Sequence, residues 1–91
     1  MNSSQTAKPR EAFLRVQLFA GVAEAAGTRL LELPWHGGTA LDLKNLLVRT
    51  VPAAANLVAT STIAVNNQYV QDTMTIDRTA DVSVIPPVSG G

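Results

Sequence analysis

The sequence predicts an α+β domain, a mixed sheet of about four or five strands with one main helix packed on one of its faces. Two observations carry this prediction. Short segments in which apolar and polar residues alternate lie toward both ends of the chain, as in half-buried strands. Between them, residues 40–51 place their apolar side chains at helical spacing. A helix between pairs of strands needs a sheet face to cover.

The first strand is predicted over residues 13–19. Its apolar and polar positions alternate, and one face consists of Leu14, Val16 and Leu18. Phe13 and Phe19 fall on the other face, with Arg15 and Gln17. This strand therefore leaves aromatic surface that requires an explanation.

Residues 20–26 are rich in alanine and predict a short helix, closed by Gly27, which can take a positive φ. Residues 29–35 alternate again and predict a second strand that pairs with the first and ends near Pro34. The following segment, His36 to Gly38, is predicted to be a loop.

The main helix is predicted to begin after Thr39, because Asp42 three residues later completes a capping box. Pro52 should end the helix at about residue 50 or 51. Its apolar side is formed by Leu43, Leu46, Leu47 and Val51. The residues expected to face water are Asp42, Lys44, Asn45 and Arg49.

The remainder alternates between short strands and loops. Residues 53–62 are small and weakly patterned, which predicts an irregular crossover with a short turn. A strand over 63–65, a turn over 66–68 and a return strand starting at Tyr69 form a hairpin. Residues 73–79 are predicted to be a surface loop and residues 81–85 the last strand.

The composition excludes several kinds of function. Seven Lys and Arg residues balance seven Asp and Glu residues, so the chain lacks the basic surface of proteins that bind nucleic acid or an anionic membrane. The absence of cysteine excludes disulfides, thiolate zinc sites and a cysteine nucleophile. We therefore expect partners that are neither nucleic acids nor membranes.

The 91 residues make one domain. Its start has no apolar segment of a secretory signal, and no run of about 18 apolar residues could span a membrane. We expect a cytoplasmic protein in which residues 1–11 form a disordered extension, residues 12–85 the folded domain, and residues 86–91 an extended functional tail.

If the last strand lies beside the first, four apolar side chains share the sheet face that the helix leaves open: Phe13, Phe19, Leu30 and Ile85. Such a cluster is typical of a partner surface, although apolar residues also occur singly on protein surfaces.

The tail begins with Pro86 and Pro87, which lack backbone donors and favour a stiff, extended arm. It ends in Gly90 and Gly91, and six residues can reach at most about 20 Å. This suits entry into a narrow channel of a partner. A frayed end or a cloning linker is the alternative, but linkers are built from polar residues, and residues 85–88 are apolar.

No set of catalytic side chains competes with the tail. His36 lies in a glycine loop without a paired carboxylate, and Gly37-Gly38 lacks the spacing and the lysine of a phosphate-binding loop. The loop carboxylates have no metal-ligand spacing. We therefore expect that the chain binds no cofactor or metal, and that catalytic groups are supplied by its partners.

Three motifs carry a family resemblance. They are Leu18-Phe19-Ala20 with Glu24 and Gly27, the turn Ala64-Val65-Asn66, and above all the end of the chain, Val84 to Gly91. They resemble the MoaD branch of the MoaD/ThiS ubiquitin-like sulfur carriers, the small subunits of molybdopterin synthase. The terminal Pro-Pro-Val-Ser-Gly-Gly is the specific part.

This resemblance implies a β-grasp, ubiquitin-like fold. It implies that a MoeB-type enzyme adenylates Gly91 with ATP, that the end becomes a thiocarboxylate, and that the sulfur passes to cyclic pyranopterin monophosphate to build the molybdopterin dithiolene. The partner is then a MoaE-type large subunit, in an assembly of two small and two large subunits. Its channel would receive Pro86, Pro87, Val88, Ser89 and Gly90.

Two alternatives remain open at this level. The chain could carry sulfur for another pathway, such as thiazole or cysteine synthesis or tRNA thiolation. It could also be a non-catalytic ubiquitin-like interaction module whose open sheet face binds a protein while the tail is inert.

Overall fold

The computed structural model describes residues 12–87. The expectations for residues 1–11 and 88–91 lie outside these described residues. The elements in chain order are β1 (Phe13–Leu18), α1 (Ala20–Ala26), β2 (Leu30–Pro34), α2 (Ala40–Thr50), the 3-10 turn η1 (Pro52–Ala54), α3 (Ala55–Thr60), β3 (Thr62–Val65), β4 (Gln68–Val70) and β5 (Val82–Ile85).

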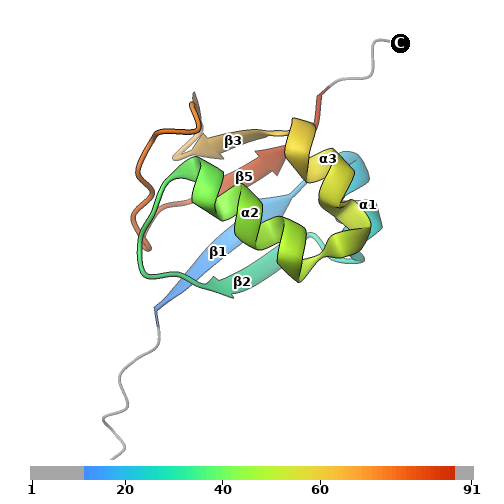
Figure 1. Ribbon diagram of the computed structural model, residues 1–91, viewed down its shortest axis with the longest axis horizontal. Helices are drawn as coiled ribbons and strands as arrows, with labels where there is room; N and C mark the ends of the chain where they lie inside the picture. Colours follow the sequence, from blue (N-terminus) through green and yellow to red (C-terminus); the bar gives the residue numbers. More distant parts are fainter. Residues whose placement is uncertain (1–11, 88–91) are drawn as a thin grey trace, which may run out of the picture.

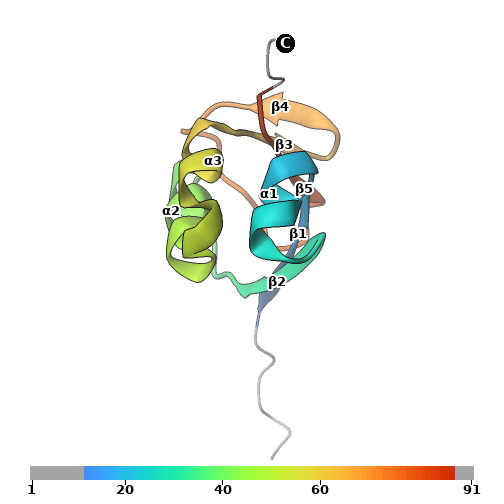
Figure 2. The same ribbon diagram turned by 90° about the vertical axis from the view of Figure 1, so that its right-hand side faces the viewer.

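The five strands form one sheet in the order β2-β1-β5-β3-β4. The central strands β1 and β5 are parallel, and the other pairs are antiparallel. α2 crosses the front of this sheet in Figure 1, and Figure 2 shows α2 and α3 on one side of it. The predicted mixed sheet with a helix on one face is confirmed.

The alternation along β1 explains how the sheet is anchored. The side chains of Leu14, Val16 and Leu18 are buried, whereas Phe13, Arg15 and Gln17 are exposed. Successive side chains of a strand point to opposite faces, so one face of β1 packs under the helices. The other elements of the core contribute Val22, Leu33, Trp35, Leu43, Leu47, Val58, Ile63, Ile76, Val82 and Val84.

The predicted capping box at the start of α2 is present. The Thr39 hydroxyl accepts a hydrogen bond from the Asp42 N–H at 3.2 Å, and the Asp42 carboxylate accepts one from the Thr39 N–H at 2.9 Å. Gly38 precedes the cap with φ 145°, and a Cβ there would lie 2.9 Å from Asp42 Oδ2. The second glycine of the His36 loop is thus required by the cap.

One prediction for the polar side of α2 is wrong. The Lys44 side chain is only 16% exposed, and its Nζ lies 3.4 Å from Oδ1 of Asp72. The segment after β4 returns across the start of α2, where the Leu41 N–H donates to the Asp72 carbonyl at 3.0 Å. Lys44 therefore lies against this segment, while Arg49 is exposed as predicted.

Residues 53–62 are not an irregular crossover. η1 and α3 occupy residues 52–60, and β3 starts at Thr62. Ala54 and Val58, four residues apart, are both fully buried. Because the segment is mostly alanine and threonine, its apolar periodicity has little contrast, and the helix depends on packing against α2 and α1.

The hairpin is tighter than predicted. Asn66 and Asn67 both have positive φ, 53° and 70°, as a two-residue type I′ turn requires, so Gln68 already pairs with Val65. Gln68 thus belongs to β4 and not to the turn.

The loop between β4 and β5 contributes to the core. Ile76 is fully buried, and its carbonyl accepts a 2.9 Å hydrogen bond from Trp35 Nε1. Its N–H donates to the Gly38 carbonyl at 2.7 Å. The prediction of a surface loop over residues 73–79 is therefore wrong at Ile76, whose flanking residues are exposed.

Replacing Trp35 by phenylalanine tests this contact. The Trp35→Phe variant should lose about 2 kcal/mol of unfolding free energy, because the buried Ile76 carbonyl is left without its donor. Urea unfolding measures this loss. Tyr69→Phe is the control, because it removes a polar group from a residue that is 71% exposed. It should change the free energy of unfolding by less than about 0.5 kcal/mol. Equal losses in the two variants would refute the assigned role of the Trp35 hydrogen bond.

Candidate functional site

The sheet face opposite α2 and α3, here called the open face, can be traced through the strand register. Leu30, Gln17, Ser83, Ala64 and Tyr69 form one row across all five strands. Their chain neighbours Val16, Val84 and Ile63 are buried under the helices. The row must therefore lie on the other side of the sheet.

Three of the four apolar residues predicted to form a partner surface are exposed to solvent. Phe13 is 49% exposed, Phe19 44% and Leu30 39%, whereas Ile85 is half-buried. Phe19 and Ile85 each follow the last residue of the β1–β5 pairing, Leu18 with Val84, so they lie at the same end of the two central strands.

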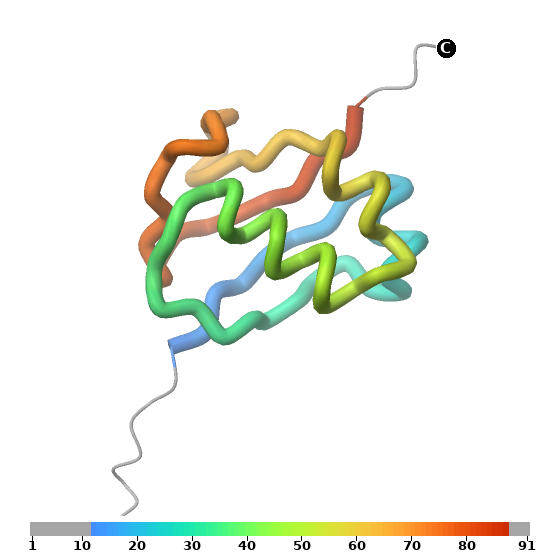
Figure 3. The backbone as a smooth tube through the Cα atoms, viewed as in Figure 1, coloured from blue at the N-terminus to red at the C-terminus, as the bar shows by residue number. Residues whose placement is uncertain are grey.

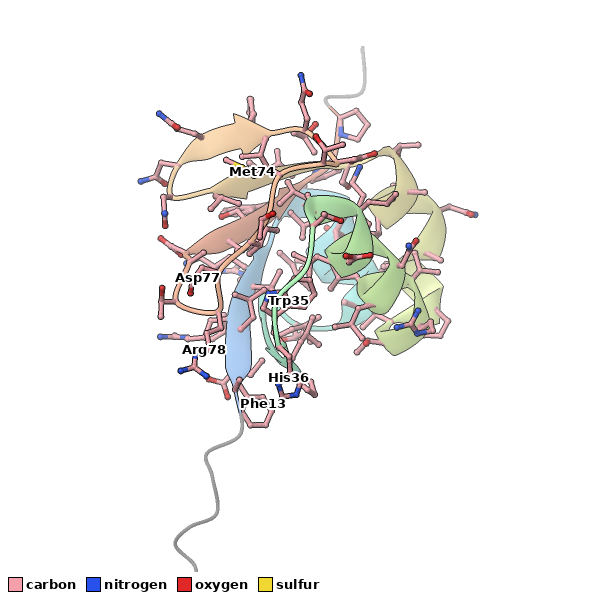
Figure 4. All side chains as sticks on the ribbon, turned by 60° about the vertical axis from the view of Figure 1, so that its left-hand side comes forward. Phe13, Trp35, His36, Met74, Asp77 and Arg78 are labelled. Carbon is pink, nitrogen blue, oxygen red and sulfur yellow. The ribbon has the colours of Figure 1, made fainter. Side chains whose placement is uncertain are left out.

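Phe13 does not share that position. It pairs with Pro34 at the opposite end of β1, about 20 Å along the strand from Phe19. Figure 4 shows it at the end of the sheet, near the loop that carries His36. The structure therefore groups Phe19, Leu30 and Ile85 toward one end and leaves Phe13 at the other.

Sequence reasoning did not include Tyr69 in the patch. Tyr69 is the most exposed of the large apolar residues at 71%, and it lies opposite Ala64 on the open face. The Asn66-Asn67 pair was the signal that could have placed Tyr69, because a two-residue turn at this pair sets the register of the hairpin and puts Tyr69 opposite Ala64.

The tail begins at the end of β5, between β1 and β3. In Figure 3 the red strand runs through the middle of the sheet to this end. Ile85 pairs with Thr62, and the next residues are the half-buried Pro86 and the exposed Pro87. The predicted tail residues Val88, Ser89, Gly90 and Gly91 lie outside the described residues.

A hollow lies at the end of the sheet opposite to the root of the tail. It is lined by His36, Asp77 and Arg78, which Figure 4 labels. The backbone N–H and the hydroxyl of Thr79 both donate to Asp77 Oδ1, at 2.8 and 2.9 Å, and these bonds lower the pKa of that carboxyl below its ordinary value. Asp77 is thus occupied in shaping its own turn.

Within residues 12–87 no three His, Cys, Asp or Glu side chains are grouped so that they could hold a metal ion. In the same part of the chain no helix has the length and apolar character needed to cross a membrane. The described site consists of the apolar side chains of Phe19, Leu30 and Ile85 on the open face, beside the root of the tail, and it offers contact surface to a partner.

The fold and this site define the class. A five-stranded mixed sheet with its main helix on one face is the β-grasp, ubiquitin-like fold, as the family resemblance implied. Residues 16–91 match the ThiS family, and the chain belongs to this family.

Two similar proteins carry the name molybdopterin synthase sulfur carrier subunit. That of Dictyostelium discoideum is 33% identical over 82 residues, which cover 85% of this chain and 94% of that protein. That of Arabidopsis thaliana is 29% identical over 79 residues, covering 86% and 82%.

Solved structures show the same fold. SAMP1 from Haloferax volcanii matches with a TM-score of 0.74 at 24% identity, over 87% of this chain and 99% of that one. A chain from the protein–protein complex of subunits 1 and 2 of the molybdopterin-converting factor of Helicobacter pylori matches with a TM-score of 0.60 at 15% identity, over 87% and 99%.

Proposed function

We propose that this chain is the sulfur-carrier small subunit of a molybdopterin synthase. The observation that carries the proposal is the position of the tail: Pro86 and Pro87 continue β5 at one end of the sheet, beside exposed apolar side chains of the open face, and the sequence ends in Gly90-Gly91. The names of the Dictyostelium and Arabidopsis relatives support it.

The chemistry begins at the terminal carboxyl group of Gly91. Its reference pKa of about 3.3–3.7 makes it an anion at neutral pH and a poor electrophile. Activation by ATP on a MoeB-type enzyme would form an acyl adenylate, and a sulfur nucleophile would then form a C–S bond while the C–O bond to AMP breaks. Because this reaction consumes ATP, we place it in the cytoplasm.

The resulting thiocarboxylate holds the sulfur on the chain's end. The sequence contains no cysteine, so no side chain could carry the sulfur as a persulfide. Gly90 and Gly91 have no Cβ, which lets the backbone enter a narrow channel and leaves the terminal carbonyl unshielded. Two such transfers to cyclic pyranopterin monophosphate would build the dithiolene.

The acceptor site would belong to a MoaE-type large subunit. The similar Helicobacter pylori chain lies in a complex of subunits 1 and 2 of a molybdopterin-converting factor, and we propose the same kind of partner here. The large subunit would cover Phe19, Tyr69 and Ile85 on the open face and receive residues 86–91 in its channel. Exposed aromatic and aliphatic residues beside a short tail are suited to such anchoring.

Intact-mass analysis tests the proposal. After coexpression with a MoeB-type enzyme, the chain should gain the mass difference of one oxygen replaced by one sulfur, localised to the C-terminal peptide. The sulfurated chain mixed with a MoaE-type subunit and the pterin precursor should then return to its original mass as molybdopterin forms. A chain that stays unmodified where a known carrier is sulfurated would exclude this function.

Complementation separates the remaining alternatives. The gene should restore molybdopterin synthesis in a strain that lacks its own small subunit. Restoration of a thiazole, cysteine or tRNA thiolation pathway alone would instead identify a carrier for that pathway. An inert tail, as in a plain interaction module, predicts that truncation after Val88 has no effect in any of these strains.

A further inference from the structure

A hollow at the edge of the open face is lined by arginine and apolar residues, a combination that the sulfur chemistry does not require. It encloses about 450 Å³ between α1, the end of β1 and the start of β2. Apolar groups of Leu18, Ala20 and Ala23 contribute to its wall, along with Phe19 and Leu30. The remaining lining residues are Arg15, Gln17 and Arg29, so the lining holds two cationic side chains and no carboxylate.

Neither arginine is neutralised strongly within the described residues. Arg15 lies 4.0 Å from Oε2 of Glu32 on β2, and the two side chains are 70% and 63% exposed, which makes this a weak pair. Arg29 is exposed and belongs to no ion pair within residues 12–87. The Arg29 carbonyl accepts a hydrogen bond from the Leu18 N–H at 2.8 Å, which fixes the backbone at the position from which the exposed side chain extends.

The apolar edge of the hollow is held in an unusual backbone conformation. Ala20 has φ 51°, in the left-handed region that alanine rarely adopts. The preceding Phe19 carbonyl accepts from the N–H groups of Val22 and Ala23, at 3.1 and 3.4 Å. This turn fixes the backbone of Phe19 and Ala20, which both line the hollow, before any partner binds, and this reduces the ordering cost of an interface.

We propose that this hollow receives an acidic side chain of the large subunit, next to an apolar one. The inference rests on the proposed function, because the hollow shares Phe19 and Leu30 with the open face that the large subunit would cover. Charge complementarity selects the occupant: two guanidinium groups around an apolar wall bind a carboxylate that is flanked by an aliphatic or aromatic side chain. Arg15 and Arg29 then help to determine which large subunit this carrier accepts.

Reversing the charge of Arg29 tests the assignment with a matched control. Arg29→Glu should weaken binding of the cognate large subunit by about tenfold or more at low salt, mainly through slower association, and the difference should shrink in high salt. Arg49→Glu makes the same change of charge at an exposed residue of α2. Because α2 lies on the sheet face opposite to the open face, this variant should bind the large subunit as the wild type does. Arg29→Gln should give an intermediate loss. Surface plasmon resonance at two salt concentrations measures all three.

Each other outcome overturns the inference. Equal effects of Arg29→Glu and Arg49→Glu would indicate a general charge effect, and no effect of either would leave the hollow outside the interface. A loss of thiocarboxylate formation with unchanged large-subunit binding would assign the hollow to the activating enzyme. These outcomes are distinct from a failure of the proposed function, in which the wild-type chain itself gains no sulfur. Circular dichroism confirms that each variant is folded.

Discussion

A chain that lacks Gly91 should fold normally and transfer no sulfur. Removing one residue withdraws the reactive carbonyl by about 3.5 Å. A displacement of about 1 Å already costs some hundredfold in rate, so the loss should exceed that value in both the adenylation and the transfer step. The described core is built from residues 14–84, before the tail begins. Thermal unfolding should therefore match that of the wild type.

A chain extended by one glycine is the matched control for this deletion. It keeps every native residue but moves the carboxyl group by the same distance in the other direction. If reach is decisive, both variants lose activity, as measured by intact mass after activation and by molybdopterin formation. Normal transfer by either variant would contradict the assignment of the terminal carbonyl as the working group.

Changing Phe19 to glutamate should weaken the complex with the large subunit without unfolding the carrier. Phe19 is 44% exposed and lies beside the root of the tail, so a charge there meets water in the free chain but an apolar partner in the complex. Loss of an interface anchor costs about 2 kcal/mol or more, which is about 30-fold in Kd.

Leu41 provides the comparison for Phe19. It is 46% exposed, nearly the same as Phe19, but lies on α2, which packs on the other side of the sheet. Leu41→Glu should bind the large subunit with wild-type affinity in isothermal titration calorimetry. If Phe19→Glu unfolds the protein, Phe19 belongs to the core. If both variants lose affinity equally, the open face is not the interface.

Most elements were predictable because their causes are local. The alternation around Val16 identified β1, and the spacing of Thr39 and Asp42 identified the start of α2. α3 was missed because alanine and threonine give a weak periodic pattern. The burial of Ile76 was missed because its exposed neighbours make the segment resemble a surface loop, and its place is set by Trp35, 41 residues away in the chain.

The candidate site was predictable only in part, because some of its residues are brought together by contacts between distant parts of the chain. Phe19 and Ile85 were expected on one face because each continues an alternating strand. Tyr69 joins that face through the register of a tight hairpin, and Phe13 leaves the group because it stands at the other end of β1. The hollow lined by Arg15 and Arg29 could not be predicted, because its wall combines residues of α1, of β1 and of the start of β2 that only the fold brings together.

By itself, the sequence determined the type and order of most elements and the absence of a thiol, and it predicts an extended tail from its prolines and terminal glycines. Proline, glycine, cysteine and capping residues act through their own covalent structure or through near neighbours, so their effects can be read from a short stretch of sequence. Only the tertiary structure decided which exposed residues lie together. Residues 19, 69 and 85 are far apart in the chain, and the pairing of β1, β5, β3 and β4 brings them to one sheet. Strand pairing depends on register across the whole sheet, and no short stretch of sequence contains that information.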